Sequence, residues 1–152
     1  MPLDLWSFAK YVYAQDGVEP SCLALQANGA DVCLVLSAIW LERNAVSVDG
    51  MRLAQLQSLA RQWQDEVIRP LRELRQTWKA AAQTDNELAQ LRQQVQTLEL
   101  HAEQTLLQRM ELLSKTWPAG GTQTDWLEGL ELSHSPQNRT ALTNLRRAVS
   151  LL

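Results

Sequence analysis

The 152-residue sequence has few of the residues that stapled, metal-bound or membrane-spanning proteins depend on. Its two cysteines and two histidines form neither a Cys-x-x-Cys pair nor a His-Glu-x-x-His motif, so no zinc site is predicted. The most apolar run extends only over residues 32–41, whereas a membrane-spanning helix needs about 20 residues. The first residues lack the basic start and apolar core of a secretory signal. We therefore expect a cytoplasmic protein with reduced cysteines and no membrane contact.

Catalytic signatures are missing as well. No glycine-rich loop precedes Lys-Ser or Lys-Thr, and no Gly-x-Ser-x-Gly is present, which excludes P-loop nucleotidases and typical serine hydrolases. The carboxylate pairs Asp65-Glu66 and Glu99/Glu103 lack the Glu-x-x-His motifs or Asp-rich clusters of di-metal and isoprenoid-synthase sites. A net charge of −3 gives no general attraction to nucleic acid. The sequence thus favours a protein that is not an enzyme and predicts neither metal nor cofactor.

The sequence does have helical periodicity almost throughout. A hydrophobic share of 45% and a charged share of 20% fit one globular domain over 1–152. Alternating strand patterns are absent. Asp4, Pro20, Asp31 and Pro136 mark starts of shorter helices, which we predict over about 5–15, 20–26, 32–43 and 136–150. Residues 118–152 are a candidate for a loosely docked C-terminal segment.

Two long apolar stripes predict an antiparallel helical hairpin over about 51–83 and 85–116. Their apolar residues recur at spacings of three and four, as on one face of a helix. The capping-box pattern that starts at Thr84 marks the turn, and Pro70 predicts a kink. Such a hairpin either projects from the other helices or is covered by them along its length. The predicted fold class is an all-α helical bundle built on this hairpin, with N-terminal helices and a C-terminal helix.

One basic stripe and one tryptophan are candidate binding residues. Arg69, Arg72, Arg75 and Lys79 recur on one helical face, which suits an anion or an acidic partner because guanidinium groups bind carboxylates and phosphates in a bidentate manner. The alternative is a solvated face that pairs with acids of its own and the neighbouring helix. Trp126 lies outside the long apolar stripes and is a candidate contact residue, since Trp is favoured at interface hot spots.

A distinctive residue pattern covers about residues 3–79. It includes Leu5-Trp6, Gly17-Val18, Cys22-Leu23, Asp31-Val32 and Trp40-Leu41 and continues to Pro70-Leu71-Arg72. In this pattern the chain resembles a family of short, uncharacterised bacterial proteins of unknown function. The family has Asn after the Asp-Val pair, where this chain has Cys33. The resemblance implies a bacterial cytoplasmic protein and no particular activity. It directs attention to Gln26 and Asp31, whose alternative roles are purely structural, as a helix-end residue and an N-cap.

Three functions follow from these observations, in order of preference. The first is a non-catalytic interaction or regulatory protein that binds another protein through a helical surface, with self-association through the long stripes left open. The alternative is a small-molecule-binding protein or enzyme with a site among the N-terminal helices. A pocket lined by Gln26, Asp31 and an arginine would favour that alternative. The third is binding of nucleic acid or another polyanion through the 69–79 stripe.

Overall fold

The structure, a computed structural model, describes residues 3–152, and every regular element in that part of the chain is helical. The predicted all-α class is therefore confirmed. The elements, in chain order, are α1 (Leu5–Tyr13), α2 (Val18–Ala27), α3 (Val32–Arg43), α4 (Gly50–Trp63), the π-helical stretch η1 (Gln64–Ile68), α5 (Arg69–Thr77), the 3-10 turn η2 (Ala81–Gln83), α6 (Asn86–Ser114), α7 (Trp126–Gly129) and α8 (Pro136–Ser150).

Side-chain caps explain where most helices begin. The Asp4 carboxylate accepts a hydrogen bond from the Ser7 amide at 2.8 Å, and the Asp49 carboxylate accepts one from the Arg52 amide at 2.8 Å. The Ser135 hydroxyl accepts from the Asn138 amide at 3.1 Å at the start of α8. Each bond satisfies one of the amides that the first helical turn leaves without a partner.

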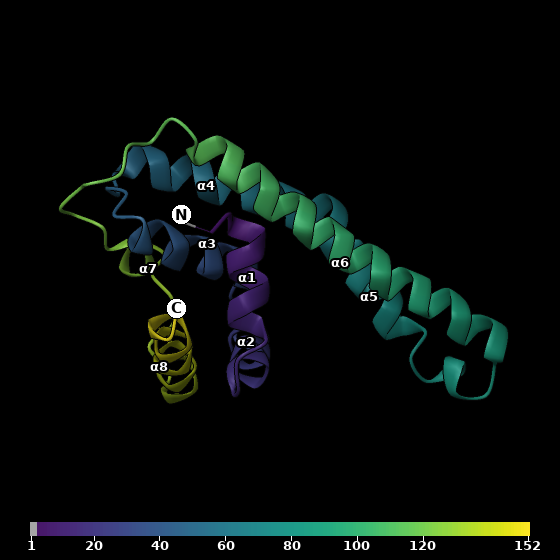
Figure 1. Ribbon diagram of the computed structural model, residues 1–152. Coiled ribbons are helices and arrows are strands. Elements are labelled where there is room, and N and C mark those ends of the chain that lie inside the picture. The colour runs from purple at the N-terminus through teal and green to yellow at the C-terminus, as the bar shows by residue number, and fades with distance from the viewer. Residues whose placement is uncertain (1–2) are drawn as a thin grey trace.

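The two long helical segments lie side by side and form the largest feature of the molecule (Figure 1). One segment is α4, η1 and α5 in continuous succession, and the other is α6. The Trp63 indole donates a hydrogen bond to the Ala102 carbonyl at 2.8 Å and so links the two. Towards its C-terminus α6 is covered, with Leu106 and Met110 fully buried, whereas Leu91 and Leu98 near the turn are about half exposed, at 51% and 52%. The hairpin is therefore covered at one end and projects at the other.

The hairpin has two local features that the sequence patterns did not specify correctly or in full. Residues 64–68 are π-helical, so the Arg69 amide donates to the Gln64 carbonyl five residues back, immediately before Pro70. Proline has no amide and clashes with the carbonyl four residues earlier, and a π-turn is one way in which a helix absorbs such a misfit. At the hairpin turn, the cap of α6 is Asp85, whose carboxylate accepts from the Leu88 amide at 3.1 Å, and not Thr84.

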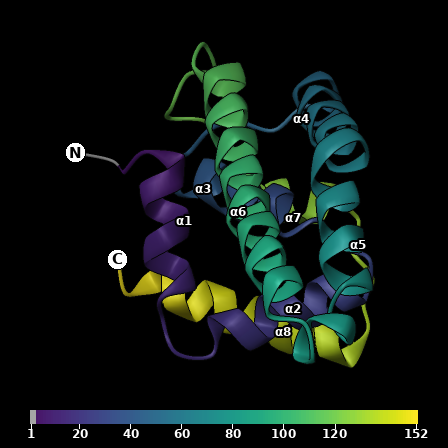
Figure 2. The same cartoon turned by 90° about the vertical axis from the view of Figure 1, so that its right-hand side faces the viewer.

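The N-terminal and C-terminal helices form the second part of the core, beneath the hairpin (Figure 2). Here α8 packs along α2, and α7 packs against α3. Trp126 of α7 is fully buried, stacks on Trp117 with ring centroids 5.6 Å apart, and donates from its indole to the Val46 carbonyl at 2.8 Å. Residues 118–152 thus contribute fully buried side chains to the core that contains α3.

Candidate ligand-binding pocket

A pocket of about 640 Å³ opens where the N-terminal helices meet the hairpin. Its walls come from α1, from α2 and the loop that follows it, from the start of α3, and from η1, α5 and α6. The polar and ionisable side chains among its lining residues are Lys10, Tyr13, Gln26, Asp31, Gln64, Arg69, Arg72, Arg75, Glu99 and Glu103. We call this site the polar pocket. Its volume lies within the range of about 300–1,000 Å³ that is typical of small-molecule sites.

Apolar and aromatic groups also line the polar pocket. Trp6 and Tyr13 come from α1, and the half-exposed Leu23 and Leu100 come from α2 and α6. The Lys10 ammonium lies 5.5 Å from the centroid of the Trp6 ring. The pocket therefore offers apolar surface for the body of a ligand beside the Lys10 cation.

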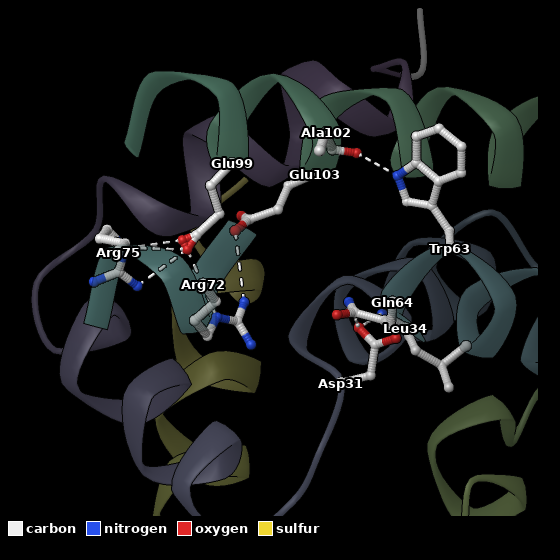
Figure 3. A network of polar contacts seen from close by, with 9 residues as sticks. All are labelled: Asp31, Leu34, Trp63, Gln64, Arg72, Arg75, Glu99, Ala102 and Glu103. Carbon is white, nitrogen blue, oxygen red and sulfur yellow. Dashed lines mark hydrogen bonds and ion pairs between the residues drawn. The ribbon is translucent and has the colours of Figure 1, made fainter. Parts of the chain in front are cut away.

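Asp31 fixes the start of α3 at the pocket wall. One carboxylate oxygen accepts from the Leu34 amide at 3.2 Å, as an N-cap does, and from the Gln64 side chain at 3.0 Å (Figure 3). Gln64 is the first residue of the π-helical stretch, so this bond joins α3 to the long hairpin. Burial raises the pKa of the Asp31 carboxyl, although these hydrogen bonds act in the opposite direction.

Arg75 and Glu99 form a tightly bonded ion pair between α5 and α6 (Figure 3). The Arg75 Nε donates to both Glu99 oxygens, at 3.2 and 3.0 Å, and its Nη2 donates to Oε1 at 3.0 Å. The Glu99 side chain is only 7% exposed. Because charge-assisted bidentate pairs are among the strong hydrogen bonds of proteins, this pair holds the two helices in register at the pocket.

Arg72 lies one turn before Arg75 and is bonded quite differently. Its Nε is 3.7 Å from Glu99 Oε1, and its Nη2 is 3.7 Å from Glu103 Oε1, too long for hydrogen bonds. The Nε atom is buried and has no hydrogen-bond partner among residues 3–152. A buried donor without a partner carries a free-energy cost of about 1–3 kcal/mol, so Arg72 has bonding capacity that the chain itself does not use.

Glu103 is a titratable group whose pKa is strongly altered by the pocket. The pKa of its carboxyl is raised to about 7: burial is the largest cause, the negative charge of Glu99 also raises it, and Arg72 lowers it. Asp31 also raises this pKa and Arg75 also lowers it, each with a smaller effect. Glu103 therefore changes charge near neutral pH, and it makes no hydrogen bond within the described chain to hold it in one state.

The two cysteines border the polar pocket but are poor nucleophiles. Both are free and buried. Burial raises the pKa of the Cys22 thiol to about 11 and also raises that of Cys33. The thiol, not the reactive thiolate, is therefore present near neutral pH. Among residues 3–152, no group of three or more His, Cys, Asp or Glu side chains is placed to hold a metal ion.

The structure separates the residues that the sequence singled out. Gln26, Asp31, Arg69, Arg72 and Arg75 all line the polar pocket. Arg72 and Arg75 face acids of the neighbouring α6 and do not form an open basic stripe (Figure 3). Arg69 is mostly exposed and pairs with Asp65, which lies four residues earlier in the same helical segment.

The remaining candidates lie elsewhere. Lys79 is exposed beyond the end of α5 and does not line the pocket, and Trp126 is in the core, without surface for a partner. Of the two carboxylate pairs considered for metal binding, Glu99 and Glu103 reach the pocket, and Asp65-Glu66 do not. Sequence reasoning missed Lys10 and Gln64 because a single polar residue on a helix has no local pattern that marks it as part of a site.

Residues 4–110 match the profile of a family described as "Protein of unknown function (DUF2390)". The chain belongs to this family. Searches among curated proteins and among solved structures found no match to it. All residues that line the polar pocket lie within the part of the chain that the family profile covers. Among the described residues, no helix is both long and apolar enough to cross a membrane.

Proposed function

We propose that the protein binds a small polar molecule in the polar pocket. The observation that carries the proposal is the meeting of Gln26, Asp31 and Arg72 in one cavity, a combination that favours a small-molecule site over a featureless helical surface. A pocket with a few convergent polar groups and titratable residues of altered pKa is the ordinary location of a binding site. Arg72 supplies unused donors and Glu103 an unused acceptor, side by side in this cavity.

The proposal places the protein in the bacterial cytoplasm. Its two cysteines are unpaired and buried, which suits a compartment that keeps thiols reduced. The ligand would then be a molecule of the cytoplasm, held in the pocket without a covalent bond to Cys22 or Cys33.

A ligand screen with a matched pair of variants tests this function. Leu100 and Leu112 are both exposed on α6, at 51% and 69%, but only Leu100 lines the polar pocket. We expect compounds from a metabolite library to raise the melting temperature of the wild type and of Leu112→Trp, because ligands stabilise the state that binds them. Leu100→Trp fills part of the pocket and should lose these shifts. Equal shifts in both variants would place binding elsewhere, and a library without any stabilising compound would remove the proposed function.

Self-association is a second candidate, because it accounts for the apolar surface at the projecting end of the hairpin. Leu91 and Leu98 are seven residues apart on α6 and half exposed, and Leu74 of α5 is 38% exposed. Heptad-spaced leucines are the contact residues of paired helices. A second copy of the chain carries the same leucines and could pack against them. We expect sedimentation to show a concentration-dependent dimer that Leu91→Glu with Leu98→Glu abolishes. A wild type that stays monomeric at high concentration would exclude this candidate.

A further inference from the structure

The two arginines at the heart of the polar pocket differ in how much bonding capacity they have left. Arg75 directs three hydrogen bonds to Glu99. Within the described part of the chain, Arg72 makes only two ionic contacts, each at 3.7 Å, and its buried Nε donates no hydrogen bond. The Arg72 side chain is 22% exposed and lines the cavity. It is thus a cation at the pocket wall whose Nη groups, unlike the buried Nε, a molecule in the pocket can reach.

Two cations at the pocket wall are available to a negative ligand. Of the four basic side chains that line it, Arg69 pairs with Asp65 outside the pocket and Arg75 pairs with Glu99. Lys10 and Arg72 make no hydrogen bond to an acid within residues 3–152. The start of α3 also borders the cavity through Asp31, Val32 and Cys33. The N-terminus of a helix carries partial positive charge and stabilises a nearby anion.

We propose that the ligand of the polar pocket is a small organic acid, whose carboxylate or phosphate group is bound by Arg72 while Glu103 takes up a proton. This inference rests on the proposed function and names the chemical class of its ligand. The acidic group would accept N–H hydrogens from the two Nη groups of Arg72, which are not buried as Nε is, and the body of the ligand would lie against Trp6 and Leu100. Guanidinium groups bind such oxyanions through two parallel hydrogen bonds.

Glu103 makes the binding sensitive to pH. As a carboxylate it attracts Arg72 and repels an incoming anion, and as a neutral acid it does neither. The charged groups that shift its pKa are Glu99 on its own helix, Arg72 and Arg75 from α5, and Asp31 at the start of α3. The charge of Glu103 in turn raises the pKa of Tyr13 and of Cys33. The proton comes from solvent, and Glu103 releases it again when the ligand leaves.

The experiment uses four compounds that share one ring and differ in charge: benzoate, phenyl phosphate, benzamide and benzamidine. Titrations of the ¹⁵N-labelled protein would follow the Arg72 Nε–H signal, which Arg72→Lys identifies by its disappearance. We expect benzoate and phenyl phosphate to bind and to shift this signal. With a Glu103 pKa of about 7, the affinity of benzoate, whose own charge does not change in this range, should fall about tenfold between pH 6 and pH 8.

Variants separate the roles of the two side chains. Arg72→Gln should weaken benzoate binding about tenfold or more, while the exposed Arg61→Gln on α4, outside the pocket, leaves it unchanged. Glu103→Gln imitates the protonated acid, so it should bind benzoate about tenfold more tightly than the wild type at pH 8 and abolish the pH dependence. The control Glu73→Gln, exposed on α5 and outside the pocket, should keep the pH dependence.

The outcomes distinguish this inference from the function on which it rests. Preferential binding of benzamidine, with affinity that rises with pH and falls in Glu103→Gln, would make the pocket a cation site and overturn the inference alone. Binding of all four compounds with no effect of Arg72→Gln would have the same result. Failure of the four compounds and of the metabolite library to bind would overturn the proposed function, and the inference with it.

Discussion

At the scale of single residues, the Arg75–Glu99 pair joins the two long helices at a nearly dry position. Replacing Arg75 leaves the buried Glu99 carboxylate with only its 3.7 Å contact to Arg72, so most of its compensation is lost. We expect Arg75→Met to lower the free energy of unfolding by about 3 kcal/mol, measured by urea denaturation. Arg69→Gln is the matched control, because Arg69 is 58% exposed and its pair with Asp65 contributes at most about 1 kcal/mol.

A double variant tests whether the loss in Arg75→Met comes from the charge left on Glu99. Arg75→Met combined with Glu99→Leu removes both charges, so it should recover much of the stability that Arg75→Met loses. If the double variant is as unstable as the sum of the two single variants, the pair contributes through packing and not through charge.

Glu103 is expected to make stability depend on pH in a particular direction. Its pKa is raised from 4.5 to about 7 in the folded protein, so the folded state holds a proton that the unfolded state releases between these values. The contribution of this group to the free energy of unfolding is fully present below pH 4.5 and is lost as the pH rises through 7. Glu103→Gln should therefore increase the urea midpoint relative to wild type at pH 8, and this advantage should shrink steadily towards pH 4.5. An advantage that does not change with pH would contradict the raised pKa.

At the scale of helices, the start of α6 shows which cap the chain uses. Asp85 bonds to the Leu88 amide, whereas the Thr84 hydroxyl only donates to the Ala81 carbonyl at 3.5 Å. We expect Asp85→Ala to reduce the free energy of unfolding by about 1 kcal/mol and Thr84→Ala by less than about 0.5 kcal/mol. Chemical denaturation of the two variants gives the comparison, and the reverse order would restore Thr84 as the cap.

The helices themselves could be predicted because each carries its own local signals. Asp31 before an apolar run, Pro136 after Ser135 and the spacing of leucines on α6 all act within a few residues. The π-helical stretch could not be predicted, since Pro70 indicates a misfit but not how the backbone absorbs it. The same limit applies to the polar pocket. Asp31, Gln64, Arg72 and Glu103 come from separate elements, and only the tertiary fold brings them together.

At the scale of the whole molecule, the C-terminal segment shares its core with α3 through Trp126. Truncation of a large buried aromatic side chain costs about 3–5 kcal/mol. We expect Trp126→Ala to lower stability by this amount, and the unfolding to remain a single transition when followed by both near- and far-ultraviolet circular dichroism. The exposed Leu112→Ala should change stability by less than about 0.5 kcal/mol. A separate early transition that Trp126→Ala alone shifts would mean that residues 118–152 unfold independently, as a loosely docked segment does.

The walls of the polar pocket come from two stretches of chain, residues 6–36 and residues 64–107. A molecule that fills the pocket would touch both stretches and act as a removable cross-link between the N-terminal helices and the hairpin. Backbone amides in α1 and α5 should then exchange their hydrogens more slowly together, since opening of either wall would require the ligand to leave. In this way a contact confined to a few side chains would couple the local opening of helices that are far apart along the chain.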